Sequence, residues 1–259
     1  MTTTNSEIPE TPWLGEGVRC CPIVELRQYT LYPGQRDVLI ELFEREFIET
    51  QEAVGIKVIG TFRREDAPDQ FVWLRGFPGM EDRLRSLKTF YSGPIWKEHR
   101  NTANATMIDS DNVLLLHPAS PASGFSLEGL TRNPVGGKLP GGLVVANIYY
   151  FNAVVSTAFL EFFENLVKPV LAETGVNPLA VFASEESPNT FPALPVREGE
   201  YVFVWFASFA DGAVYERHLA QLAASQKWQD TISEQLAAFL VKEPEVLRLI
   251  PTARSLFKG

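Results

Sequence analysis

The stretch FVWLRGF at residues 71–77 returns, slightly altered, as FVWFASF at residues 203–209. In the first copy, hydrophobic side chains occupy both sets of alternating positions, one set containing Trp73 and the other containing Leu74. Successive side chains of a strand point to opposite faces, so this pattern predicts a strand that is buried on both faces. A sheet built from such strands needs a covering layer on each side.

The residues around the first heptapeptide predict a βαββαβ order. The strand-like stretch CPIVELRQYTL ends at Pro33 and Gly34, and apolar residues at helical spacing then continue to Gly55. Two strands follow, IKVIGTF and QFVWLRGF, on either side of the turn-rich REDAPD. A helical region over 79–105 and the strand NVLLL complete a ferredoxin-like arrangement.

The same pattern recurs 120 positions later, and 132 positions later beyond the second strand. Trp73 and Trp96 return in phase as Trp205 and Trp228. The change of offset means that the second copy has about twelve extra residues, which fall in the Pro-rich stretch ASEESPNTFPALPVREGE. We interpret the chain as a duplicated unit.

The fold class that follows is α+β, with two tandem ferredoxin-like units. Each single unit covers one sheet face with its helices, so the other apolar face must be covered by the second copy. We therefore expect one pseudo-symmetric α+β barrel with the helices outside. The expected organisation is an N-terminal arm (1–22), a first unit (23–118), a Gly/Pro-rich linker (119–142) and a second unit (143–257).

Composition excludes several classes of function. The net charge of −9 over 259 residues argues against a nucleic-acid partner, which would require a basic surface. No apolar run reaches the roughly 20 residues that span a bilayer, and the N-terminus has no signal-peptide pattern. Cys20 and Cys21 are adjacent, and we expect two ordinary thiols in a reducing, cytoplasmic protein.

Three stretches resemble the NIPSNAP family of the dimeric α+β barrel superfamily. They are VELRQYTLYPG, FVWLRGFPGMEDRLRSLKTFYSGPIWKEHR and NATMIDSDNVLLLHP, and the resemblance covers 23–118 well and 143–257 more loosely. It implies the tandem barrel. The superfamily includes cofactor-free monooxygenases, isomerases, haem-binding enzymes and non-catalytic members, so the resemblance specifies the fold more firmly than the chemistry.

Candidate site residues come from comparing the two copies with each other. Both copies must build the same scaffold, so a polar residue that is replaced by an apolar or neutral one needs another explanation. The five such pairs are Arg27/Asn147, Arg75/Ala207, Tyr91/Ala223, His99/Thr231 and Arg100/Ile232. Strand parity places Arg75 on the face of Trp73, and Arg27 on the face of Tyr29. A site, if present, belongs to the first copy.

Each candidate also has a structural interpretation. Arg75 is a partner for Glu81 or Asp82 in that interpretation, and Arg27 for Glu25. His99 and Tyr91 would be packing residues of a helix, and Arg100 a solvated surface residue. The pair Asp109 and Asp111 is typical of a turn rather than of a cation site. The spacing of His99, His117 and His218 does not match that of zinc ligands.

The leading functional hypothesis is a small-molecule enzyme that performs cofactor-free oxygenation or proton transfer, such as isomerisation or dehydration, on an anionic or aromatic metabolite. We expect catalytic roles for His99, Arg75 and Tyr91, no metal and no cofactor. The expected substrate-binding residues are Arg27, Tyr29, Trp73, Trp96 and Arg100. We also expect that only the first copy has a polar-lined cavity.

The alternatives are a non-catalytic NIPSNAP-type binding module and a haem protein with His99 as ligand. Association of the chain into a homo-oligomer is left open.

Overall fold

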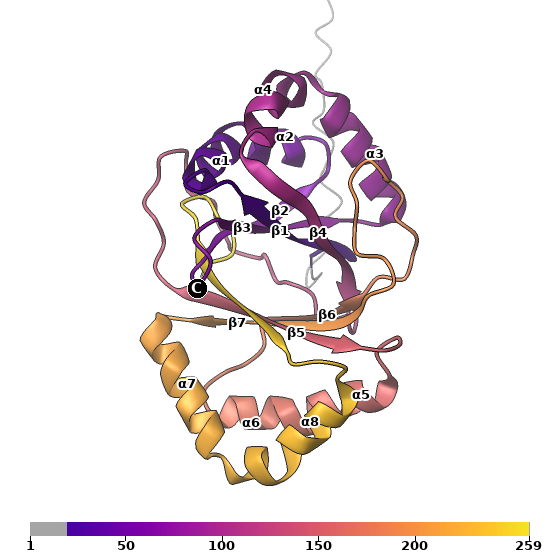
Figure 1. The fold of residues 1–259 in the computed structure, drawn as a ribbon, viewed down its shortest axis with the longest axis vertical. Coiled ribbons are helices and arrows are strands. Elements are labelled where there is room, and N and C mark those ends of the chain that lie inside the picture. The colour runs from indigo at the N-terminus through magenta and orange to yellow at the C-terminus, as the bar shows by residue number, and fades with distance from the viewer. Residues whose placement is uncertain (1–19, 259) are drawn as a thin grey trace, which may run out of the picture.

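The computed structural model describes residues 20–258, so the expected N-terminal arm falls almost entirely outside the described residues. Two helical layers enclose a central β-barrel, with the first half of the chain on one side and the second half on the other (Figure 1). The strands are β1 (Ile23–Leu31), β2 (Lys57–Arg64), β3 (Gln70–Phe77), β4 (Met107–Pro118), β5 (Leu143–Phe151), β6 (Ala180–Ser184), β7 (Tyr201–Phe209) and β8 (Glu245–Pro251).

Helical segments fill the places that the periodicity predicts. In the first unit they are α1 (Arg36–Leu42), the π-helical turn η1 (Phe43–Phe47), α2 (Ile48–Glu52), α3 (Met80–Ser92) and α4 (Pro94–Asn104). In the second unit they are α5 (Thr157–Phe162), η2 (Phe163–Val167), α6 (Lys168–Glu173), α7 (Gly212–Ala224), η3 (Trp228–Ile232) and α8 (Ser233–Phe239). Pro94 occupies the first turn of α4, where its missing N–H costs nothing.

The sheet closes completely, in the order β1-β3-β2-β8-β5-β7-β6-β4. Pairs such as Phe62 with Pro251 join β2 to β8, and pairs such as Leu116 with Ser184 join β4 to β6. Each half of the barrel is a four-stranded antiparallel sheet, and joining the two halves leaves no unpaired edge. The predicted fold class, an α+β barrel with its helices outside, is confirmed.

Burial on the two faces of β3 explains the opening heptapeptide. Val72 and Leu74 point into the barrel, where side chains of both units form one apolar core. Phe71, Trp73 and Phe77 point outward and pack beneath the helices of the first unit. A third core lies between the second half of the sheet and its own helices.

Strand β4 differs from the expected strand at 112–116. It begins at Met107, so Asp109 and Asp111 lie within a strand rather than in a turn. The extension arises because β4 follows β1 along almost its whole length, with register shifts opposite Thr30. Among the described residues, no group of three or more His, Cys, Asp or Glu side chains is arranged to hold a metal ion.

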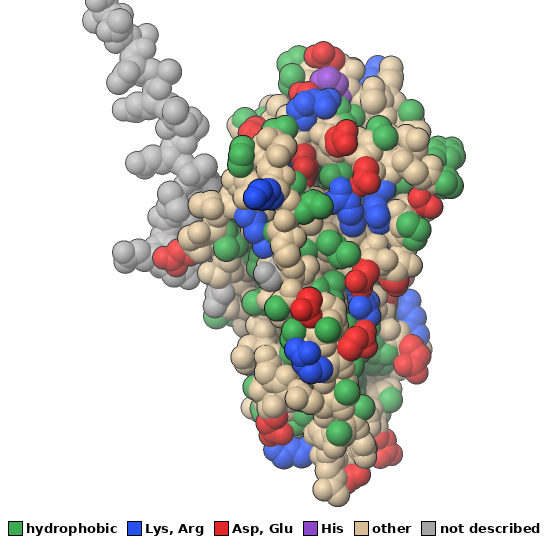
Figure 2. Space-filling view, turned by 90° about the vertical axis from the view of Figure 1, so that its left-hand side faces the viewer, with side chains coloured by type: hydrophobic (Ala, Val, Ile, Leu, Met, Phe, Trp, Pro, Cys, Tyr) green, Lys and Arg blue, Asp and Glu red, His purple; other side chains and the backbone are tan. Residues whose placement is uncertain are grey.

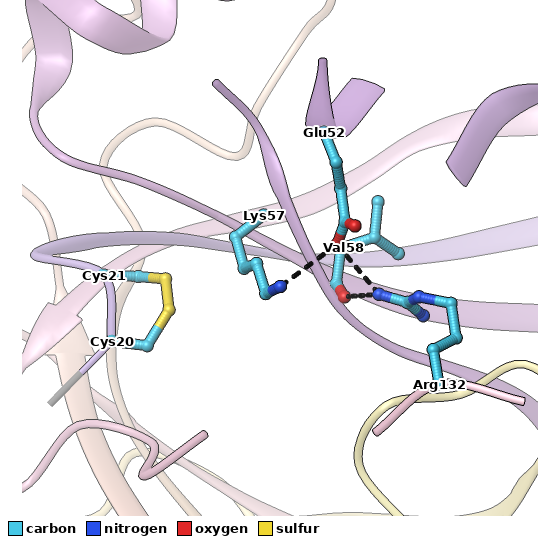
Figure 3. The surroundings of a disulfide bond; sticks show 6 residues. All are labelled: Cys20, Cys21, Glu52, Lys57, Val58 and Arg132. Carbon is cyan, nitrogen blue, oxygen red and sulfur yellow. Dashed lines mark hydrogen bonds and ion pairs between the residues drawn. A yellow bond between two sulfur atoms is a disulfide. The ribbon is translucent and has the colours of Figure 1, made fainter. Parts of the chain in front are cut away.

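The linker and the C-terminal segment both pack on the first unit. Arg132 of the linker donates hydrogen bonds to Glu52 Oε1 at 2.9 Å and to the Val58 carbonyl at 2.6 Å (Figure 3). Beyond β8, Thr252 Oγ1 donates to Glu44 Oε1 at 2.6 Å, and the Arg254 backbone N–H donates to the same oxygen at 2.8 Å. These contacts tie the two ends of the second unit to the first.

Cys20 and Cys21 form a disulfide between neighbouring residues (Figure 3). The expectation of two ordinary thiols was wrong. Cys21 has a positive φ of 72°, a backbone conformation that brings two adjacent side chains toward each other where an extended backbone would separate them. Cys21 is fully buried against β3 at Gly76, where a Cβ would clash with its sulfur.

No helix in the described part of the chain is both long and apolar enough to cross a membrane. On the face drawn in Figure 2, Lys and Arg side chains are interspersed with Asp and Glu.

Candidate active site

Three arginines of the first unit converge on one carboxylate. Glu25 Oε2 accepts from Arg75 Nε at 2.6 Å and from Arg27 Nη1 at 2.7 Å, and Glu25 Oε1 accepts from Arg83 Nε at 2.6 Å. All four side chains are fully buried. We call Glu25, Arg27, Arg75 and Arg83 the arginine cluster.

Regular secondary structure positions the arginine cluster. Glu25 and Arg75 are direct cross-strand partners on β1 and β3, and Arg27 lies two residues from Glu25 on the same face. Arg83 comes from the first turn of α3, which follows β3 after a short turn and folds back over the sheet. Gln51 of α2 adds an amide oxygen, 3.3 Å from Arg75 Nη1.

The pKa values of the cluster residues depend on burial and on the charges of their neighbours. Burial alone would raise the pKa of Glu25, but the three arginines, Arg75 foremost, hold that pKa well below its usual range. Burial lowers the pKa of Arg83, and the charge of Glu25 opposes this effect. Against the effect of burial, Tyr29 and Glu25 raise the pKa of Arg27. Glu25 is therefore ionised at neutral pH.

The cluster carries more positive than negative charge. Three guanidinium groups face the single carboxylate of Glu25, and a buried charge is costly unless it is paired. Two buried donors, Arg75 Nη2 and Arg83 Nη2, have no hydrogen-bond partner among the described residues. The arrangement is suited to an additional anion, for which these N–H groups would be the donors.

Aromatic rings line the cluster on one side. The Trp73 ring lies 5.0 Å from the Arg75 guanidinium carbon and 5.7 Å from that of Arg27. The Tyr29 hydroxyl accepts a hydrogen bond from Arg27 Nε at 3.0 Å, and burial raises the pKa of Tyr29. Tyr29 is therefore a neutral phenol whose own O–H remains available as a donor.

A second aromatic group lies where α3 meets α4. The Tyr91 ring packs edge-on against Trp96, with ring centroids 4.8 Å apart, and it stacks on Phe191 at 5.9 Å. Phe191 belongs to the Pro-rich stretch between β6 and β7, so a side chain of the second unit reaches the first.

We call this stretch, residues 185–200, the strap. Figure 1 shows it as the orange loop that rises from the barrel to lie beside α3. Its Asn189 Oδ1 accepts from Arg83 Nη1 at 3.0 Å, and its Thr190 Oγ1 accepts from the same nitrogen at 3.1 Å. The site is therefore assembled from both halves of the chain.

Of the five residues that the comparison of the two copies singled out, the structure places Arg27 and Arg75 in the arginine cluster. Arg27, Arg75, Tyr29 and Trp73 are in mutual contact, and Arg27 pairs with Glu25 as its structural interpretation proposed. Arg75 also pairs with Glu25, rather than with the Glu81 or Asp82 suggested by that interpretation.

His99 and Arg100 occupy different surroundings. His99 Nε2 lies 3.7 Å from Glu46 Oε2, and its ring packs on Phe47. Arg100 is exposed on α4. Within the described residues, no hydrogen bond or ion pair joins either residue to the arginine cluster.

Glu25, Arg83, Gln51 and the strap were missed as site components, although the sequence held a signal for Glu25 and Arg83. At the offsets of the repeat, Glu25 corresponds to Val145 and Arg83 to Tyr215. Each is a charged residue of the first copy that the second copy lacks, so a comparison that covered every position would have included both.

A cavity of about 420 Å³ lies in the second unit, between η2, β6 and the start of the linker. Phe163 and Phe203 line it together with polar groups of Glu164, Lys168 and Ser120. The expectation that only the first copy has a polar-lined cavity was therefore wrong. The linker leaves this space open, whereas the corresponding place in the first unit is filled by the C-terminal segment.

Comparisons with solved structures show that the whole barrel is shared. An anthrone oxidase-like protein is 13% identical with a TM-score of 0.56, and the match covers 92% of this chain and 95% of that one. A Fusobacterium nucleatum protein provisionally named a monooxygenase is 11% identical with a TM-score of 0.51, covering 90% and 93%. At these identities the likeness shows the fold alone. No curated protein matches the sequence.

The first unit carries a more specific likeness. The sequence model of the NIPSNAP family matches residues 24–122. A NIPSNAP-like domain protein from Burkholderia xenovorans is 33% identical, and the match covers 38% of this chain and 85% of that one, with a TM-score of 0.35. The chain therefore belongs to the NIPSNAP family through its first unit.

Proposed function

We propose that the chain is a small-molecule enzyme whose substrate is an anionic, flat metabolite bound at the arginine cluster. The observation that carries this proposal is the buried excess of positive charge, three guanidinium groups on the one carboxylate of Glu25. Guanidinium groups recognise carboxylates and enolates through paired N–H donors, and they hold such anions best where water is excluded. Trp73 provides an apolar wall beside the donors.

The chemistry we propose is cofactor-free oxygenation or proton transfer. In both reactions negative charge develops on a substrate oxygen, and preorganised donors lower the free energy of that state. Arg75 and Arg83 would stabilise this charge through their unpaired Nη2 groups. Tyr29, whose phenol is neutral and whose oxygen already accepts from Arg27, would donate a proton or a hydrogen bond. Structural likeness to an anthrone oxidase-like protein and to a protein provisionally named a monooxygenase supports this class only at the level of the fold.

A non-catalytic binding module is the second candidate, and the position of His99 favours it. His99 was the expected general acid or base, but its contacts are with Glu46 and Phe47. A site without a titrating base would hold an anion without transforming it. The haem alternative requires His99 as ligand, and His99 is not among the residues that line the cavity of the second unit. An absorption spectrum of the purified protein tests it.

Mass spectrometry of the purified, denatured protein tests the proposal. We expect a retained anionic small molecule in the wild-type protein, and its loss from Arg75→Ala, since each charge-assisted hydrogen bond contributes about 1.5–3 kcal/mol. The matched control is Ala207→Gly, which changes the corresponding position of the second unit and should leave the ligand in place. Equal retention by all three proteins would contradict the proposal. Turnover of the identified molecule would separate an enzyme from a binding module.

A further inference from the structure

The connection between the second and third strands differs in length between the two units. In the first unit, the turn between β2 and β3 is short, spanning residues 65–69, and its Glu65 pairs with Arg248 of β8 beside the second unit's α7. In the second unit the corresponding connection is the strap, which reaches α3 of the first unit. The strap therefore contacts the arginine cluster at Arg83, whereas the short turn at 65–69 contacts the second unit, which has no such cluster.

Both ends of the strap are firmly attached to β4. The Glu185 N–H donates to the Leu115 carbonyl at 2.8 Å, and the Arg197 N–H donates to the Val113 carbonyl at 2.9 Å. Arg197 also donates from its side chain to Glu200 at 2.8 Å. The ends therefore extend the edge where β4 meets β6 and are fixed by the barrel.

The tip of the strap is attached differently. Its polar contacts to α3 are the two hydrogen bonds from Arg83 to Asn189 and Thr190 and a long 3.4 Å hydrogen bond from Thr190 to the Met80 carbonyl. Its apolar contacts are the Phe191–Tyr91 stack and the packing of the partly buried Phe191 and Leu194 at the edge of the first unit's core. None of the tip side chains is fully buried. A segment with fixed ends and few buried contacts opens at a lower free energy than the surrounding sheet and helices.

Arg83, which the tip contacts, and Arg75, which shares Glu25 with it, are both fully buried, so a ligand reaches them only when part of their cover moves. The sheet below them is closed, and α3 is packed through the fully buried Leu87. Displacing the tip breaks its contacts to α3 and the packing of Phe191 and Leu194 at the edge of the first unit's core, and it frees Arg83 Nη1 at the same time.

We propose that the strap is the gate of the arginine site and that Asn189 is its latch on Arg83. When the tip is closed, Asn189 and Thr190 occupy one nitrogen of Arg83 and orient its guanidinium toward Glu25. When the tip opens, that nitrogen becomes a donor for an incoming anion. Asn189 is a positioning residue here, since it acts through Arg83. The inference rests on the proposed anion site, and its test is arranged so that the two can fail separately.

Phenylglyoxal, which modifies guanidinium groups that solvent reaches, provides the test without any ligand. Peptide mass spectrometry follows the modification rate of Arg75 and Arg83 in the folded protein. We expect slow modification in the wild type and a rate about tenfold higher in Asn189→Ala, since a hydrogen bond to a charged group is lost. A second variant, in which Gly-Gly replaces residues 188–195, should react at least as fast. Glu65→Gln, the matched change in the short turn, should leave the rate at the wild-type value.

Two outcomes would overturn the gate. One is an Asn189→Ala rate equal to that of the wild type, with the shortened strap also unchanged. The other is modification that follows global unfolding in every variant, as measured by its dependence on urea. Benzoate in the reaction separates the two proposals. Protection of Arg75 by benzoate supports the anion site, whereas faster modification without protection leaves the gate standing and rejects a benzoate-like ligand.

Discussion

The two units have the same arrangement of strands and helices, but the space between sheet and helices holds buried charges in the first unit and an apolar core in the second. Under the helices of the first unit lie Glu25, Arg27, Arg75 and Arg83, and the corresponding residues of the second unit are Val145, Asn147, Ala207 and Tyr215. In the second unit, Val145, Ala207 and Tyr215 belong to a continuous apolar core. The scaffold therefore folds without the charges. Because replacing a buried ion cluster by packed apolar residues is often neutral or stabilising, stability alone does not explain the arginine cluster.

A second difference concerns what covers η1 and η2. In the first unit Glu44 accepts hydrogen bonds from the C-terminal segment at Thr252 and Arg254. Its counterpart Glu164 pairs with Lys168 at the surface and lines the open cavity. The two units thus share their strand order, but they differ in the segments that follow β4 and β8. The segment after β8 fills the space beside η1, whereas the segment after β4 leaves a cavity beside η2.

Removing the carboxylate should have the largest effect. Glu25→Ala leaves three buried guanidinium groups without a counter-charge, and breaking a buried ion pair costs about 3–5 kcal/mol of unfolding free energy. Urea denaturation measures this loss. Glu81→Ala, an exposed change on α3, is the control and should stay within about 0.5 kcal/mol. A loss below about 1 kcal/mol for Glu25→Ala would show that the cluster is hydrated rather than buried.

Acidification should have the second-largest effect, a loss of stability that comes from Glu25 of the first unit. The pKa of Glu25 is lower in the folded protein than in the unfolded chain, so its contribution to stability is complete above the unfolded value and is lost as pH falls below it. Below about pH 4.5 the wild type should lose up to about 1.4 kcal/mol per pH unit from this group. The control is a four-residue graft of the second unit's residues, Glu25→Val, Arg27→Asn, Arg75→Ala and Arg83→Tyr. Identical pH slopes for the two proteins would contradict the assignment.

The graft itself sharpens the comparison at neutral pH. It replaces the arginine cluster by the uncharged residues that the second unit already has at these positions, so its unfolding free energy should lie within about 2 kcal/mol of the wild-type value. Binding of any ligand retained by the wild type should disappear. Calorimetry measures the binding, and urea denaturation measures the stability. Retained binding in a stable graft would move the site away from the cluster.

The smallest effect is expected at His99. Its side chain is 22% exposed and its Nε2 lies 3.7 Å from Glu46 Oε2, a contact of the kind that contributes about 0–1 kcal/mol. His99→Ala should therefore change the unfolding free energy by less than about 1 kcal/mol and leave ligand binding intact. Thr231→Ala, at the corresponding position, is the control. Loss of turnover in His99→Ala alone would restore the role of general acid or base expected from the sequence.

The architecture could be predicted because its signals are local. Alternation along 71–77 placed Val72 and Trp73 on opposite faces, and the recurrence of Trp73 and Trp96 in phase indicated two similar units. Part of the site was predictable for the same reason, since strand parity placed Arg75 on the face of Trp73 and Arg27 on the face of Tyr29. Comparison of the two copies identified those arginines, but Glu25 was considered only as a structural partner of Arg27.

Contacts between distant residues depended on the closed structure. Arg83 reaches Glu25 because α3 folds back over β1, and helical periodicity says nothing of that angle. The His99 side chain faces Glu46 because η1 and α4 pack together, and helical periodicity alone does not predict that contact.

The amino-acid sequence by itself determined the strands, the helices and the asymmetry in charge between the units, because these follow from alternation, periodicity and residue type. Only the tertiary structure decided where the strap lies. Its twelve extra residues belong to the second unit, yet pairing of β4 with β6 carries them onto α3 of the first. Barrel closure depends on strand pairing between segments far apart in the chain, and no local pattern encodes which of the two sites a connecting loop will cover.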